Sequence, residues 1–81
     1  MKVKVVCFGA MRAYLPAAAS GNSAELEVRE GARAVDVIDA LGAPRQLVFA
    51  LLIDGEQASL EGGLRDGSEV TVMPPFAGGR P

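Results

Sequence analysis

The sequence of 81 residues contains no histidine, no tryptophan and a single cysteine, Cys7. One cysteine cannot form an internal disulfide, so nothing in the sequence indicates an oxidising compartment. Metal sites need clustered histidine, cysteine or carboxylate side chains, and we find no such cluster, so we expect the chain to bind no metal. The cytoplasm is the expected location.

Long apolar runs and runs of one charge are also missing. No stretch approaches the roughly 18–20 apolar residues of a membrane helix. The start, Lys2-Val3-Lys4-Val5, is too polar for a signal peptide. Eight basic and ten acidic residues give a net charge of −2 and are scattered along the chain, without the basic stripe that nucleic acids require. We therefore expect neither a membrane nor a nucleic acid as a partner.

Hydrophobic residues make up 49% of the chain, which suffices for one compact core. A chain of this length forms one domain and leaves little room for a deep substrate cavity. We expect a domain over residues 1–73 and a flexible tail over residues 74–81.

The first half of the chain predicts a hairpin with a long loop. Residues 2–8 are rich in β-branched side chains, with Val3, Val5 and Cys7 on one face. Residues 9–23 indicate a loop that includes a helical turn near residues 11–15. Residues 24–29 alternate between apolar and charged side chains, which is typical of a half-buried strand.

A change of period then predicts a short helix. Val35, Ile38 and Leu41 recur at helical spacing, and Gly42 and Pro44 mark the end.

The polar residues of this helix give two further expectations. Asp36 and Asp39 should lie on the solvent face as hydrated charges. Ala32 and Arg33 occupy the place where serine, threonine or aspartate would cap the helix, so we expect its start to fray.

The second half predicts further strands. Residues 47–53 form a continuous apolar run, which indicates a strand covered on both faces or central in a sheet. Asp54-Gly55 predicts a tight turn followed by a short return over residues 56–59. A turn at residues 65–68 precedes a last strand at residues 69–73.

The order strand–strand–helix–strand–strand indicates an α+β fold. We expect a mixed sheet of four to five strands with one main helix across one face. The first and last strands should pair in parallel at its centre.

The tail carries the most informative pattern, Pro74-Pro75-Phe76-Ala77-Gly78-Gly79. Two glycines without Cβ atoms suit a backbone that must enter a narrow tunnel in another protein. Taken alone, the glycines fit a disordered tail or a cloning remnant equally well.

Residues 2–79 resemble a known family, the ubiquitin-like sulfur carriers. The matching segments are Val3-Lys4-Val5-Val6-Cys7-Phe8-Gly9, Arg29-Glu30-Gly31, Ile53-Asp54-Gly55-Glu56, Leu64-Arg65-Asp66-Gly67-Ser68-Glu69-Val70 and Pro74-Pro75-Phe76-Ala77-Gly78-Gly79. The ending is most similar to the small subunit of molybdopterin synthase, since the thiazole carriers usually lack the two prolines. The resemblance implies a β-grasp, ubiquitin-like fold.

The same resemblance implies a chemistry. A partner enzyme similar to the ubiquitin-activating enzymes, using ATP and magnesium, would adenylate the carboxylate of Gly79. A sulfur donor would then displace AMP and leave a thiocarboxylate. Gly78, Ala77, Pro75 and Pro74 would enter the large subunit of molybdopterin synthase, or another acceptor enzyme. The chain itself would bind no cofactor and would be a carrier, not an enzyme.

The sequence departs from the family at its end, because Arg80 and Pro81 follow Gly79. Adenylation needs a free carboxylate, so we expect a peptidase, for example a zinc metalloprotease of the deubiquitinase type, to cut after Gly79. The alternatives are that the two residues belong to a precursor or come from cloning.

An apolar patch beside the tail docks partners in this family. Phe8, Leu60, Met73 and Phe76 are the candidates here. For Phe8 and Leu60 the alternative is ordinary core packing. Cys7 is expected to be inert packing.

Other functions remain open. The chain could be a ubiquitin-like modifier joined through Gly79 to lysines, since the activation step is shared. As a carrier it could serve pterin, cysteine, thiamine or another thio-metabolite. A third reading is a noncatalytic interaction module whose tail is never processed.

Overall fold

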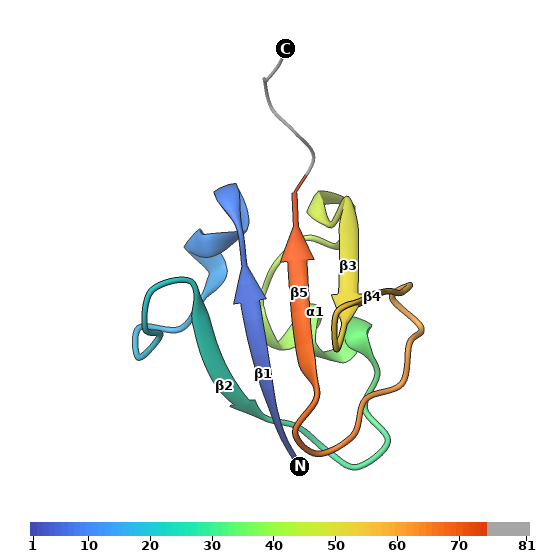
Figure 1. Ribbon diagram of the computed structural model, residues 1–81. Helices are drawn as coiled ribbons and strands as arrows, with labels where there is room; N and C mark the ends of the chain where they lie inside the picture. Colours follow the sequence, from blue (N-terminus) through green and yellow to red (C-terminus); the bar gives the residue numbers. More distant parts are fainter. Residues whose placement is uncertain (75–81) are drawn as a thin grey trace.

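The structure is a computed structural model that describes residues 1–74 (Figure 1). Five strands, one α-helix and two 3₁₀ helices are assigned in this range. They are β1 (Lys2–Cys7), η1 (Gly9–Tyr14), β2 (Ser23–Glu27), α1 (Ala34–Leu41), η2 (Arg45–Leu47), β3 (Ala50–Ile53), β4 (Glu56–Gln57) and β5 (Glu69–Met73). The predicted order of elements is therefore confirmed.

The strands form one mixed sheet in the order β2-β1-β5-β3-β4. β1 pairs in parallel with β5, with Val5 opposite Val70, and this pair is central as predicted. β2 pairs antiparallel with β1, and β3 pairs antiparallel with β5. The five-stranded sheet with one main helix is the β-grasp arrangement expected from the sequence.

The core lies between the sheet and α1, which lies behind the sheet in Figure 1. Alternation along the strands directs every second side chain to this side. The buried cluster consists of Val3, Val5, Cys7, Met11, Ala34, Val37, Ile38, Ala43, Leu51, Leu64, Val70 and Val72. The other face of the sheet is not covered by α1.

The Asp54-Gly55 turn forms as predicted between β3 and β4. Both residues have positive φ, +52° for Asp54 and +86° for Gly55. Positive φ at both central residues matches the right-handed twist of the flanking strands. The Asp54 carboxylate also accepts a hydrogen bond from the Glu69 N–H at 2.9 Å, which ties this turn to the start of β5.

The strand predicted over residues 47–53 is shorter than expected. β3 covers only Ala50–Ile53, and the chain before it forms η2. Ala50 is opposite Met73, the last residue of β5, so the regular ladder between β3 and β5 ends at this pair. The position of β3 between β5 and the two-residue β4 is also less central than the apolar run suggested.

The start of α1 has partners that the sequence did not reveal. The Ala34 N–H donates to the Gly62 carbonyl and the Val35 N–H donates to the Leu60 carbonyl, each at 2.9 Å. The Arg33 N–H donates to the Asp36 carboxylate at 2.8 Å. Because the first amides of a helix lack partners within the helix, these bonds remove the reason for expecting a frayed start.

The two helix aspartates are also more than hydrated charges. Asp36 caps the helix and forms an ion pair with Arg29, with 3.2 Å between Nη2 and Oδ2. Asp39 forms two hydrogen bonds with Arg45 at 2.7 and 3.1 Å. The hydrogen bond from Arg45 lowers the pKa of Asp39.

We predict that Asp36→Ala destabilises the protein more than Asp36→Asn does. Alanine removes the acceptor for the Arg33 N–H, and loss of a helix cap costs about 1 kcal/mol. Asparagine keeps an acceptor and loses only the charge that faces Arg29. Urea unfolding of the two variants and the wild type measures both effects. Equal stability of the two variants would mean that the charge, and not the cap, matters at this position.

Candidate functional site

The candidate site lies where β5 ends. Met73 is the last residue of β5. Two other segments lie on either side of this strand end and form backbone hydrogen bonds with it. The Phe8 N–H donates to the Val72 carbonyl at 3.1 Å, and the Phe49 N–H donates to the Met73 carbonyl at 2.8 Å. Three segments far apart in the sequence therefore meet at the end of β5, just before the tail begins.

Two exposed apolar residues belong to the segments that are bonded to this point. Phe8 is 43% exposed and Phe49 is 66% exposed, and they are the large hydrophobic residues assigned as exposed in residues 1–74. Met73 and Pro74 beside them are half-buried. We call these four residues the tail-exit surface.

Strand alternation explains why Phe8 and Met73 face away from the core. Cys7 is opposite Val72, and both side chains are fully buried between the sheet and α1. The next residue of each strand, Phe8 and Met73, therefore points to the face that α1 leaves uncovered. A large apolar group placed there by the pairing of two central strands is available to a partner protein.

Gly9 fits closely against the first proline of the tail. It has a φ of +56°, which favours glycine, and a Cβ atom built on it would lie 3.0 Å from Cγ of Pro74. Glycine at this position therefore lets the chain turn out of β1 into η1 while Pro74 packs directly against its backbone.

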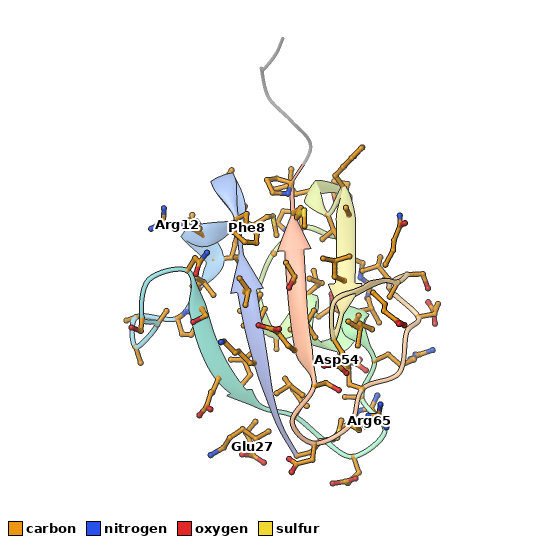
Figure 2. All side chains as sticks on the ribbon, viewed as in Figure 1. Phe8, Arg12, Glu27, Asp54 and Arg65 are labelled. Atoms are coloured by element: carbon orange, nitrogen blue, oxygen red, sulfur yellow. The ribbon has the colours of Figure 1, made fainter. Side chains whose placement is uncertain are left out.

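Arg12 is a charged residue at this end of the molecule. Figure 2 shows Phe8 and Arg12 at the same end of the sheet, with Arg12 pointing outward from η1. Within residues 1–74 the Arg12 side chain has no hydrogen bond or ion pair. A cation beside an apolar patch is typical of a surface that meets another protein.

The predicted site residues have different outcomes. Phe8 is exposed and belongs to the tail-exit surface, with Met73 and Pro74. Leu60 is half-buried and packs against the core, which was the alternative left open for it. Pro75, Phe76, Ala77, Gly78 and Gly79 lie outside the described residues, so the expectations for them stay predictions.

Phe49 is the functional candidate that the sequence analysis missed. Its place inside an apolar run suggested a buried strand residue. The available signal is the length of the last strand, because five residues of β5 cannot pair with all seven residues of the apolar run beside it.

The rest of the described chain offers no competing chemical centre that we can identify. Cys7 is fully buried, and burial raises the pKa of its thiol, which agrees with inert packing. Residues 1–74 contain no group of three or more potential metal ligands. A 590 Å³ depression beside the β3–β4 turn, lined by residues such as Glu56, Gln57 and Arg65, does not include the tail-exit surface. None of the helices among these residues has the length and apolarity to span a membrane.

Comparison with known proteins places this geometry in a family. The family model described as Mut7-C ubiquitin matches residues 1–79, so the match ends at the second tail glycine. No curated protein matches the sequence significantly.

Solved structures give the same fold. SAMP1 from Haloferax volcanii has 22% sequence identity and a TM-score of 0.74, with 98% of this chain and 100% of that chain covered. The putative molybdopterin converting factor subunit 1 from Pyrococcus furiosus has 27% identity and a TM-score of 0.68, with 93% and 98% covered. A chain in the complex of subunits 1 and 2 of molybdopterin-converting factor from Helicobacter pylori 26695 has 20% identity and a TM-score of 0.61, with 98% and 100% covered.

We predict that Gly9→Ala and Gly21→Ala differ in their effect on the tail exit. Both positions have positive φ, so alanine should cost roughly 1–2 kcal/mol of backbone strain at each. Only at Gly9 does the added methyl group meet Pro74, since nothing lies within 4 Å of a Cβ atom at Gly21. Urea unfolding should show a larger loss for Gly9→Ala, and amide NMR shifts at Met73 should change only in that variant. Identical shifts at Met73 would contradict the contact.

Proposed function

The chain belongs to the Mut7-C ubiquitin family of ubiquitin-like proteins, and from this membership we propose that it carries sulfur as a thiocarboxylate on Gly79. The observation that carries the proposal is the match of the family model through Gly79, together with a fold that brings β5 out of the sheet directly into the Pro74-Pro75 tail. The domain would therefore be the part that partner enzymes bind, while the tail carries the reactive group.

The proposed chemistry begins with a free carboxylate. A peptidase hydrolyses the Gly79–Arg80 peptide bond, which gives Gly79 its carboxylate and releases Arg80-Pro81. An activating enzyme then joins this carboxylate to the α-phosphate of ATP, with loss of pyrophosphate. Hydrosulfide-equivalent sulfur from a donor attacks the carbonyl carbon, a C–S bond forms, and AMP leaves with the oxygen. The resulting thiocarboxylate is a good nucleophile at neutral pH.

The contribution of the described residues is recognition. The tail-exit surface offers two exposed phenylalanines on either side of Met73, from which the tail continues. Aromatic side chains at the centre of an interface commonly supply much of its binding energy. A partner that covers this surface would hold the start of the tail at the entrance of its own active site. The catalytic groups, ATP and magnesium belong to that partner.

Molybdopterin synthesis is the proposed destination of the sulfur. The similarity to the Pyrococcus furiosus subunit 1 and to a chain of the Helicobacter pylori complex of subunits 1 and 2 supports a large-subunit acceptor. In this assignment the tail enters the large subunit, which holds the acceptor.

A second candidate is a protein modifier, because the chain also has the fold of SAMP1, the small archaeal modifier protein 1 of Haloferax volcanii. The same activated Gly79 would then form an isopeptide bond with a lysine. The two functions share activation and differ in the group that attacks the carbonyl.

We predict that protein purified from its native host ends at Gly79. Intact mass spectrometry should show loss of Arg80 and Pro81, and a fraction with one oxygen replaced by sulfur after incubation with the activating enzyme, ATP and a sulfur donor. The matched variant, deletion of Gly79 together with the last two residues, should remain folded but unmodified. A native protein that always keeps Arg80-Pro81 would exclude the carrier function, and a ladder of isopeptide-linked products would favour the modifier.

We predict that Phe8→Ala and Phe49→Ala each weaken binding to the activating enzyme about tenfold or more. Phe49 is 66% exposed, so Phe49→Ala should change the free energy of unfolding by less than about 1 kcal/mol. Phe8 is 43% exposed, so Phe8→Ala should cost about 1–2 kcal/mol and leave the protein folded. Binding can be measured by calorimetry with protein that ends at Gly79. Glu56→Ala in the edge strand β4 is the control and should bind as the wild type does. Unchanged binding of both phenylalanine variants would mean that partners dock elsewhere.

A further inference from the structure

The outer edge of β2 has backbone groups that the sheet does not use. In an antiparallel ladder, residues alternate between bonding to the neighbour and pointing away from it. The Val28 N–H donates to the Met1 carbonyl at 2.8 Å, so the even-numbered residues of this strand face β1. Glu25 and Glu27 therefore direct their N–H and C=O groups outward, where residues 1–74 provide no hydrogen-bond partner for them.

The open part of this edge has a defined upper boundary. Ser20 and Ser23 exchange two backbone hydrogen bonds, at 2.9 and 3.1 Å, and so close the beginning of β2. Below them a depression of about 500 Å³ is lined by Pro16, Ala18, Ser20, Ser23, Ala24, Glu25 and Lys4. The opposite edge of the sheet is β4, which has only two residues. Short edge strands resist pairing with other chains, so β2 is the edge that can accept another strand.

The negative charge of Glu25 and Glu27 favours a partner strand with basic side chains. Glu25 is exposed, and the Glu27 side chain is 73% exposed although it pairs with the Met1 ammonium at 3.2 Å. Lys4 lies opposite Glu25 and Lys2 lies opposite Glu27, both on β1. The Lys4 ammonium pairs with Glu69, and within residues 1–74 no ion pair joins Lys2 to Glu27, so the glutamates are the charged side chains next to an added strand. Two β2 edges brought together would place these glutamates near one another, and like charges across strands are unfavourable. A strand with basic side chains would instead be attracted.

We propose that the β2 edge binds an extended segment of another protein with lysine or arginine at alternate positions. The segment adds to the sheet as a further strand, with its backbone bonded to Glu25 and Glu27 and its basic side chains beside their carboxylates. This site is separate from the proposed sulfur chemistry, because β1 lies between β2 and β5 (Figure 1). Glu27 also lies at the opposite end of the sheet from Phe8 (Figure 2).

The test uses the full chain, labelled with nitrogen-15, and two short synthetic peptides. In one peptide lysine alternates with threonine and valine, and in the other glutamate replaces each lysine. The lysine peptide should shift the amide signals of Glu25 and Glu27, and its binding should weaken with added salt. The glutamate peptide should cause no shift.

Three variants separate charge from backbone pairing. Glu25→Gln with Glu27→Gln should weaken binding about fivefold, since each cross-strand charge pair contributes modestly. Glu25→Pro removes an outward N–H that β1 does not use and should abolish the backbone pairing. Glu56→Gln, on the other edge, is the control and should change nothing. If Glu25→Pro fails to give a folded NMR spectrum, the glutamine variant decides.

Three results would overturn the proposal. They are equal binding of both peptides, shifts centred on Phe8 and Met73, and no binding of the lysine peptide at millimolar concentration. None of these depends on Gly79, so the sulfur-carrier function can fail while this site stands, and the reverse also holds.

Discussion

The parallel pairing of β1 with β5 is the interaction on which the rest of the molecule depends. It joins the two ends of the described chain, which are more than 60 residues apart, at the centre of the sheet. Its inward side chains, among them Val5, Val70 and Val72, are fully buried and form part of the core between the sheet and α1. Because β5 is held in the centre, the chain reaches Pro74 from the middle of the sheet. The tail-exit surface is a consequence of this pairing, since Phe8 follows β1 and Met73 ends β5.

The two interactions proposed for this domain require no pocket. Its two candidate interaction sites are surfaces, one apolar at the end of β5 and one acidic at the outer edge of β2. The first is suited to a partner that must hold the start of the tail. The second is suited to a partner that recognises the sheet itself. Their separation on the sheet would allow both to be occupied at once, for example during transfer of the chain from one partner to the next.

The secondary structure and topology could largely be predicted from local pattern. Alternation in residues 2–8 and 69–73, helical spacing in residues 35–41 and the Asp54-Gly55 turn depend on neighbours in the chain, and these elements formed as expected. The length of β3 and the start of α1 could not be predicted in the same way. Each is decided by a segment distant in sequence, β5 for the strand and the Leu60 and Gly62 carbonyls for the helix.

The same division applies to function. The sequence by itself determined the Pro-Pro-x-x-Gly-Gly ending and, through it, the chemistry proposed for Gly79, because a reactive terminus is a property of the chain and not of its folding. Only the tertiary structure decided which apolar side chains reach the surface near that ending. Phe49 lies before the start of β3 and is exposed, whereas Leu60 packs against the core and its carbonyl accepts a hydrogen bond from the Val35 N–H of α1. Exposure depends on which strands and helices meet, and that is settled only when distant parts of the chain come together.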